Sequence, residues 1–180
     1  MDTSPLTKLF PAFLAIEDTD LRRLSMDAMA MAMEKGGWTM ENIGQCPVTL
    51  NWKDCDVSWV EHVTDVTALC LMEFNALEKY YKRHGVPFSR DVVVAGALLH
   101  DIGKLTEFVF QDGKAVHGDD FQLLRHPLSG AIIAAQAGLP ANLVHLIATH
   151  SFEGDKSYQT AESKFVRTID IFVFQNSVAG

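Results

Sequence analysis

The residues of this chain best suited to chemistry are histidines and aspartates that stand at breaks in an apolar pattern. His100 and Asp101 follow one apolar run, and His150 follows another. His126 stands directly before Pro127, a residue that often opens a helix. A metal ligand must reach a shared cavity that water can enter, and helix ends beside a cleft offer such positions. The pattern therefore indicates a metal site.

Two further candidates, His62 and Asp170, lie inside stretches with helical periodicity. Asp170 stands between Ile169 and Ile171, and a carboxylate buried among such neighbours needs a strong partner such as a cation. Each of the six candidates also has an ordinary structural interpretation, because a lone histidine on a helix is usually a core or surface residue. That ordinary interpretation would have to apply independently to all six residues, which favours the metal site.

The adjacent pair His100 and Asp101 is the most specific feature of the sequence. Neighbouring residues on a regular helix point about 100° apart, but at the end of a helix they can converge on one ion. A carboxylate has two oxygens, so Asp101 is the natural bridge between two ions.

The order of these residues resembles a known family. His62, then His100-Asp101-Ile102-Gly103-Lys104, then Asp170 is similar to the H…HD…D signature of HD-domain phosphohydrolases, and ALLHDIGK (97–104) resembles the HDIG form of that motif. HPLSGAIIA, which begins at His126, and ATH, which ends at His150, resemble the additional histidines of the two-metal subset. The resemblance spans residues 58–174.

The resemblance implies a dinuclear centre and a reaction. His62, His100, Asp101 and Asp170 would bind one divalent ion, and Asp101, His126 and His150 the other. Mixed imidazole and carboxylate sites suit Fe, Mn, Co, Ni or Zn. The implied activity is metal-dependent hydrolysis of a phosphoester in a nucleotide or related small molecule, with Asp101 and Lys104 as catalytic residues. Candidate phosphate-binding residues are Lys104, Arg125 and Arg167, whereas His84, His117 and His145 match no ligand of the family.

Other functions use the same ligands. Residues 104–130 also resemble the HD portion of bacterial 3′-to-5′ exoribonucleases. Some HD-fold proteins are di-iron oxygenases, and a lysine after the HD pair occurs in them too. A non-catalytic module that binds a nucleotide is a third alternative, although degenerate modules of that kind should have lost metal ligands.

Six helices and one turn are expected to position the site. The fold class that the pattern and the resemblance predict is an all-α HD-domain bundle of about six helices, with a small β-hairpin after the HD motif over residues 102–116, turning at Asp112-Gly113. Residues 1–57 would form an N-terminal helical extension and loop, and residues 58–180 the metal-binding core of one compact domain. The expected helices are 18–36, 58–81, 92–99, 126–138, 140–149 and one from Thr160 onward.

Composition limits the setting and the partners. A net charge of −8 disfavours an extended nucleic-acid surface, and 180 residues with 48% hydrophobic content suffice for one core. An odd number of cysteines without a CxxC pair (Cys46, Cys55 and Cys70) favours a reducing, cytoplasmic location. No apolar run approaches the roughly 18 residues of a membrane span. The expected partner is a small phosphorylated substrate, and the N-terminal helix could cover the site or form a homodimer.

Overall fold

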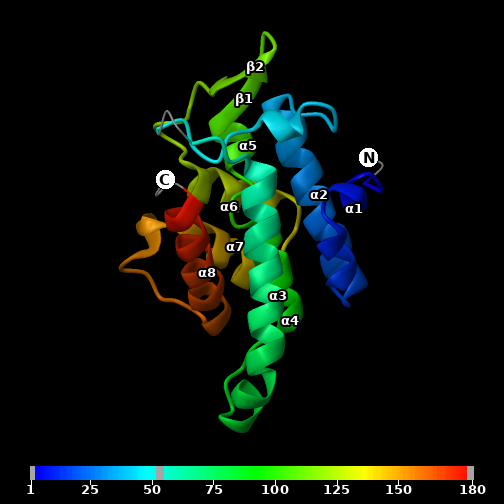
Figure 1. The fold of residues 1–180 in the computed structure, drawn as a ribbon, viewed down its shortest axis with the longest axis vertical. Helices are drawn as coiled ribbons and strands as arrows, with labels where there is room; N and C mark the ends of the chain where they lie inside the picture. The colour runs from blue at the N-terminus through cyan, green and yellow to red at the C-terminus, as the bar shows by residue number, and fades with distance from the viewer. Residues whose placement is uncertain (1–2, 52–54, 178–180) are drawn as a thin grey trace.

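The computed structural model describes residues 3–51 and 55–177, which fold into a helical bundle with a small hairpin at one end (Figure 1). Within these described residues, six helices have nine or more residues, in agreement with the predicted all-α class. They are α2 (Thr19–Gly36), α3 (Trp59–Arg83), α4 (Arg90–Leu99), α6 (His126–Gln136), α7 (Ala141–Thr149) and α8 (Ala161–Ser177). Shorter elements are α1 (Leu6–Leu9), α5 (Lys104–Glu107), the 3₁₀ turns η1 (Pro11–Ala15), η2 (Ile43–Gln45) and η3 (Phe152–Gly154), and the strands β1 (Phe108–Gln111) and β2 (Lys114–His117).

Side-chain caps begin the two longest helices where the sequence predicts. Asp18 accepts hydrogen bonds from the first backbone amides of α2, and Gly37 ends that helix with φ of 72°. Ser58 and Glu61 form a reciprocal capping box at the start of α3. Each cap satisfies amides that the helix itself leaves unpaired, so these bounds follow from local chemistry.

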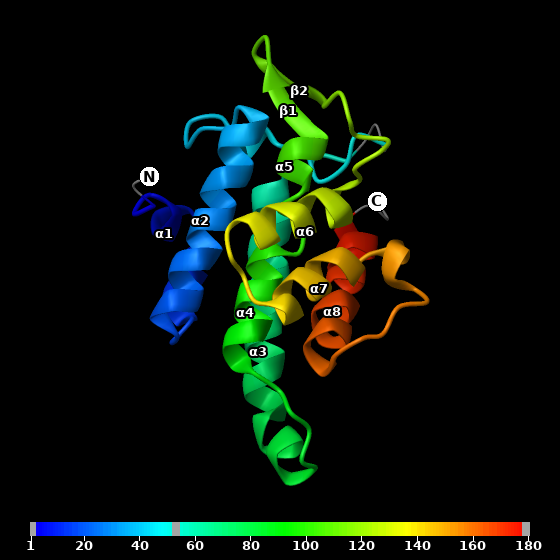
Figure 2. The same ribbon diagram turned by 180° about the vertical axis from the view of Figure 1, so that it is seen from behind.

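Helix α4 is the centre of the bundle. Residues 92–99 are all buried, which explains why this segment lacks a polar face. The helix packs against α2, α3, α7 and α8, and Figure 2 shows α6 and α7 crossing the face opposite α3. The end of α4 therefore lies among several other helix ends, which makes it suitable for assembling a site.

The hairpin is shorter than the sequence pattern predicts. Strands β1 and β2 pair in antiparallel register, and Asp112 and Gly113 form the turn with positive φ angles of 52° and 80°. The predicted hairpin began near Ile102, but residues 104–107 form the single helical turn α5 instead. One turn is too short to show a periodicity, so the sequence gives no signal for it.

The N-terminal segment is part of the same core. Leu6, Phe10 and Phe13 are buried, and the Phe10 ring makes an edge contact with Trp59 at 5.7 Å between centroids. The short elements α1 and η1 were not predicted, because each is only a turn or so in length. The proposed division at residues 57 and 58 remains a prediction.

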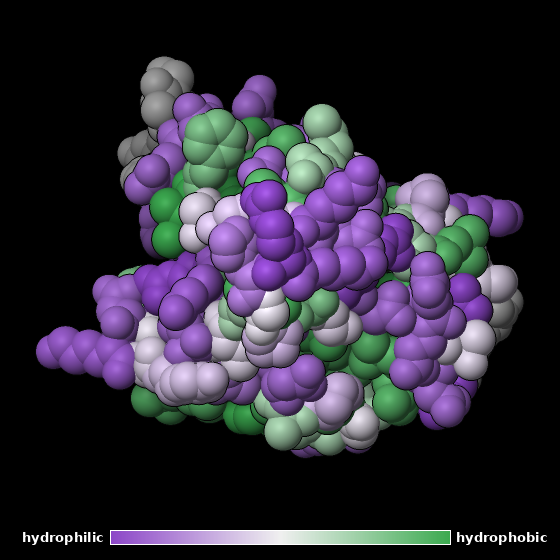
Figure 3. All heavy atoms as spheres, turned by 90° about the horizontal axis from the view of Figure 1, so that it is seen from below, coloured by the Kyte–Doolittle hydropathy of each residue, from purple (hydrophilic) through white to green (hydrophobic). Residues whose placement is uncertain are grey.

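The surface is mixed in character. Seen from below, hydrophilic residues cover much of the face, and hydrophobic residues form patches between them (Figure 3). Among the described residues, no helix combines the length and hydropathy needed to cross a bilayer.

Candidate metal centre

The structure brings all six candidate ligands together. They come from α3, α6 and α8 and from the residues that follow α4 and α7, so five helices contribute to one site. All are buried except Asp170, whose side chain is 14% exposed. Their ligand atoms form two groups, each spanning less than 4.8 Å: His62, His100 and Asp170, and Asp101, His126 and His150.

Asp101 lies between the two groups. Its Oδ1 is 3.3 Å from Nε2 of both His126 and His150. Its Oδ2 is 3.4 Å from Nε2 of His62 and 3.5 Å from Nε2 of His100. One carboxylate therefore faces both groups with different oxygens, as the sequence argument for a bridging residue requires.

Backbone carbonyls set the tautomers of two histidines. Nδ1 of His100 is 2.8 Å from the Ala97 carbonyl, and Nδ1 of His150 is 2.7 Å from the Ile147 carbonyl. A carbonyl oxygen only accepts, so Nδ1 carries the proton in each ring. In the neutral rings Nε2 then presents a lone pair to the centre of the site, which is the form that binds a metal.

These lone pairs face other acceptors. Nε2 of His100 is 3.5 Å from Oδ2 of Asp101, and Nε2 of His150 is 3.3 Å from Oδ1 of the same carboxylate. Such contacts repel unless a positive charge lies between the atoms. The residues present can therefore hold a divalent metal ion, because such ions are commonly bound by imidazole nitrogen together with carboxylate oxygen.

Glu107 orients a third histidine of the cluster, His126, and sequence reasoning missed this acidic residue. Its Oε2 accepts hydrogen bonds from the backbone amide of His126 at 2.7 Å and from Nδ1 of the same residue at 2.9 Å. This fixes the His126 ring with Nε2 toward Asp101. The only signal in the sequence is that Glu107 is an acidic residue shortly after the HD pair. Its partner, His126, lies 19 positions further along the chain.

The charges of the site are strongly coupled. Burial alone would lower the pKa of His100, but Asp101 and Asp170 outweigh it and raise that pKa to about 10. Burial alone would raise the pKa of Asp101, but Lys104 and His100 hold it well below its ordinary value. Burial lowers the pKa of His62 and of His126. Without a metal, a proton on His100 supplies part of the positive charge that two buried carboxylates require.

Two close backbone contacts place the HD pair. A Cβ at Gly103 would lie 2.0 Å from the His126 carbonyl and 2.6 Å from Oγ of Ser129, so only glycine lets α6 approach this closely. The buried Trp59 donates from Nε1 to the Asp101 carbonyl at 3.0 Å. These contacts hold Asp101 and His126 at a fixed separation.

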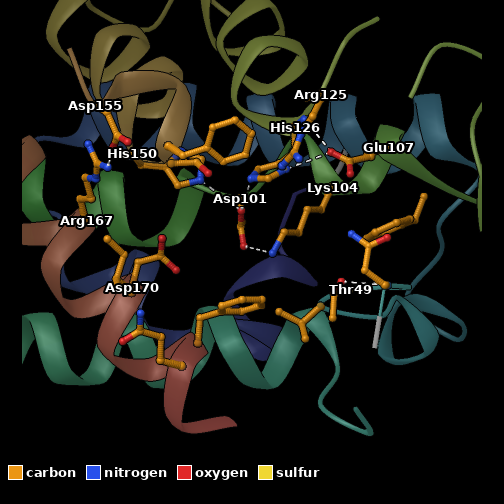
Figure 4. Close-up of a pocket in the computed structure, with 18 residues that line it drawn as sticks. Thr49, Asp101, Lys104, Glu107, Arg125, His126, His150, Asp155, Arg167 and Asp170 are labelled. Carbon is orange, nitrogen blue, oxygen red and sulfur yellow. Dashed lines mark hydrogen bonds and ion pairs between the residues drawn. The ribbon is translucent and has the colours of Figure 1, made fainter. Parts of the chain in front are cut away.

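A cavity of about 550 Å³ opens over the site. Figure 4 shows Asp101 and Lys104 at its centre, Asp170 on α8 at one side, and His126 with Glu107 at the other. Its other lining residues come from the segment before α3, from the residue before α6, from the η3 segment and from α8, and they include Thr49, Asn51, Arg125, Phe152, Asp155, Arg167, Ile171, Phe174 and Gln175.

The three candidate phosphate-binding residues all line this cavity. Nζ of Lys104 is 2.7 Å from Oδ2 of Asp101. Arg125 pairs with Glu153 at 3.2 Å, and Arg167 pairs with Asp155. Both arginines therefore already have carboxylate partners at the cavity wall. The histidines left out of the predicted site, His84, His117 and His145, are not among the residues that line this cavity.

Comparison with known proteins identifies the family of this chain. The family model of the HD domain matches residues 59–173. A dihydroneopterin 2′,3′-cyclic phosphate phosphodiesterase from Methanocaldococcus jannaschii is 32% identical over 118 residues, which cover 64% of this chain and 45% of that protein. The chain thus matches less than half the length of this curated relative, and no solved structure gives a significant match. Because the family model covers well over half of the chain, from the first residue of α3 almost to the end of α8, this protein belongs to the HD-domain family.

Proposed function

We propose that this protein hydrolyses a phosphoester bond in a small phosphorylated molecule, at a dinuclear metal centre formed by the six clustered side chains. Cyclic phosphodiesters are the substrate class to examine first, because the relative from Methanocaldococcus jannaschii is named as a cyclic phosphate phosphodiesterase.

One observation carries the proposal. The two oxygens of Asp101 face two separate sets of ligand atoms, and each set contains two histidines within 3.5 Å of the nearer oxygen. A single shared carboxylate of this kind is what a pair of neighbouring cations needs. Divalent ions, when bound, stabilise charge on phosphoryl oxygens and lower the pKa of water toward neutrality.

Lys104 is the residue of the chain best placed to act on substrate. Its ammonium is buried against Asp101 and lines the cavity, and its Nζ lies 5.6 Å from the ring centroid of Phe174. A phosphoryl oxygen that enters beside Asp101 would meet this positive charge in a site where little water screens it. Arg125 and Arg167 are weaker candidates, because a phosphate would have to displace Glu153 or Asp155.

The cavity fits a small molecule. Its volume of about 550 Å³ lies within the range of roughly 300–1,000 Å³ typical of small-ligand sites. The net charge of −8 disfavours a broad basic surface for a nucleic acid and therefore favours a compact substrate.

The proposal is tested by hydrolysis assays on metal-stripped protein before and after reloading with Mn, Co, Fe, Ni or Zn. Nucleoside 2′,3′-cyclic phosphates and bis(p-nitrophenyl) phosphate are the substrates, and each assay is repeated without oxygen. We expect turnover that requires metal and is indifferent to oxygen.

The Asp170→Asn variant tests the assignment of ligands, because it keeps the shape of a side chain at the edge of the cluster and removes its charge. It should lose most of the turnover and retain the helical circular dichroism spectrum. Turnover that persists in chelator, or that consumes oxygen, would contradict the proposal.

A further inference from the structure

The outer part of the cavity contains an aromatic ring that the proposed hydrolysis does not use. Phe152, in η3, lines the cavity and is 60% exposed. A single exposed aromatic residue is common on protein surfaces, so its exposure alone indicates nothing. Its surroundings, however, distinguish it from an ordinary surface residue.

The guanidinium of Arg125 lies over this ring. Its central carbon is 4.9 Å from the ring centroid of Phe152, and its Nε pairs with Glu153 at 3.2 Å. The cation covers part of the ring and is itself held by a neighbouring carboxylate. The remaining exposed surface of the ring is available to a ligand in the cavity.

The segment that carries Phe152 is fastened to the end of α7. Gln159 donates from Nε2 to the carbonyls of Thr149 and Gly154, both at 3.2 Å. A Cβ at Gly154 would lie 2.1 Å from the Thr149 carbonyl, so the two backbones are in close contact. The backbone that carries the ring is therefore held in place before a ligand arrives, which lowers the entropic cost of binding.

The ring is also close to the candidate metal centre along the chain. Phe152 follows His150 by two residues, and Arg125 directly precedes His126. Since consecutive Cα atoms are about 3.8 Å apart, each member of the stack is anchored within roughly 8 Å of a cluster histidine. Phe152 and Arg125 line the same cavity as Asp101 and Lys104, so a molecule with its phosphate beside Asp101 can extend a ring toward Phe152 within that cavity.

We propose that Phe152, supported by Arg125, is a stacking surface for a planar heterocycle of the substrate. The substrate class is then a phosphoester of a nucleobase-like or pterin-like compound, and simple alkyl and sugar phosphates are poor ligands. This proposal rests on the proposed function and refines it, because it names the part of the substrate that lies away from the reacting phosphorus. Every planar heterocycle offers a π-face, so stacking selects a class of rings and no single base.

The test compares two probes that carry the same phosphate on the same sugar, AMP and ribose 5-phosphate. Their binding to the metal-loaded protein is measured by calorimetry, at a temperature at which no phosphate is released during the titration. Three proteins are compared: the unaltered chain, Phe152→Leu, and Tyr158→Leu. The Phe152→Leu substitution keeps apolar bulk and removes the aromatic face. Tyr158 is the matched control, because it is 78% exposed and is not among the residues that line the cavity.

We expect the unaltered protein to bind AMP at least about tenfold more tightly than ribose 5-phosphate, and the Phe152→Leu variant to reduce that ratio to about twofold or less. Binding of ribose 5-phosphate should not change, and Tyr158→Leu should keep the full ratio. An unaltered protein that does not discriminate between the probes overturns the proposal, and so does a ratio that survives in Phe152→Leu.

Hydrolysis assays on the same proteins separate this proposal from the proposed function. If Phe152 controls AMP binding but no phosphoester is hydrolysed with any metal, the stacking surface stands and the hydrolase proposal fails. If phosphoesters are hydrolysed with equal kcat/KM whether or not they carry a heterocycle, the hydrolase proposal stands and the stacking surface is rejected.

Discussion

The buried floor of the cavity and its outer wall are built in different ways. On the floor, His100 and His150 are fixed by backbone carbonyls at adjacent helix ends, and Asp101 is 2% exposed. On the wall, Arg125 and Phe152 are held by an ion pair and a ring contact, and both remain open to solvent. Residues that would bind metal are thus placed by the bundle itself, whereas residues that would select a substrate lie on short segments attached to it. The predictions below test that difference.

The largest effect is expected at Asp101, where the two groups of ligands meet. The Asp101→Asn variant keeps the shape of the side chain but removes the charge that both groups face, so activity should fall by about 10³-fold or more. At least one metal ion per chain should be lost, as measured by elemental analysis.

His145→Ala is the control for this change. Nε2 of His145 contacts the Tyr158 carbonyl at 2.8 Å, and this histidine belongs to neither group of ligands. Metal content and activity should stay within about twofold of the unaltered protein. Loss of metal in the His145 variant, with both ions kept in the Asp101 variant, would reverse the assignment of ligands.

Glu107 should give a smaller effect on the same floor. The Glu107→Gln variant removes the charged acceptor of the His126 ring, and loss of such a supporting partner typically costs about 10–100-fold in metal affinity or activity. Metal titration should show weakened binding at the group that contains Asp101, His126 and His150.

Glu78→Gln is the matched control, because Glu78 pairs with Lys82 on the exposed part of α3. Its metal affinity should equal that of the unaltered chain. If Glu107→Gln bound metal as tightly as Glu78→Gln does, the hydrogen bonds to His126 would have no functional importance.

Gly103 tests whether the floor tolerates any change in packing. The added methyl group of Gly103→Ala would meet the His126 carbonyl, so α6 must shift, and we expect a loss of about 1–3 kcal/mol in the free energy of unfolding. Gly44→Ala has open space around its Cβ and should change stability by less than about 0.5 kcal/mol. Urea denaturation measures both, and equal values would show that the contact at Gly103 is easily relieved.

A further prediction concerns metal-stripped protein, whose stability should depend on pH. The pKa of His100 is raised from 6.5 to about 10, so its contribution is complete below pH 6.5 and disappears as pH approaches 10. The pKa of Asp170 is lowered from 3.8, so its contribution is present above that pH and is lost in stronger acid.

Chelator-treated protein should therefore be most stable between about pH 4 and 6.5 and should unfold at lower urea concentration as pH rises toward 10. The His100→Gln variant should show a flatter profile over that alkaline range. An unchanged decline in the variant would mean that another group causes it.

The sequence predicted the helices with strong local signals. The cap at Asp18, the capping box at Ser58 and the turn at Asp112-Gly113 are local features, and the corresponding elements are present. The one-turn helices α1 and α5 were missed because four residues show no periodicity. The ligands of the floor could be predicted because they follow the motif of a known family. The stack of the outer wall could not, because no motif contains it.

Within the site, sequence reasoning identified the residues that now lie together but could not supply their partners. Glu107 was missed because its contact with His126 depends on how α5 packs against α6. The stack of Arg125 and Phe152 was missed for the same reason, because 27 positions separate the two residues and only the fold brings them into contact.

The central claim is that six side chains hold two cations. The most direct measurement is the metal-to-protein ratio of purified chain after reconstitution with Fe, Mn, Co, Ni or Zn and removal of excess ion. We predict about two ions per chain for at least one of these metals. A ratio that stays below about 0.2 for all of them would contradict a metal centre, and a ratio that saturates at one would contradict a dinuclear centre.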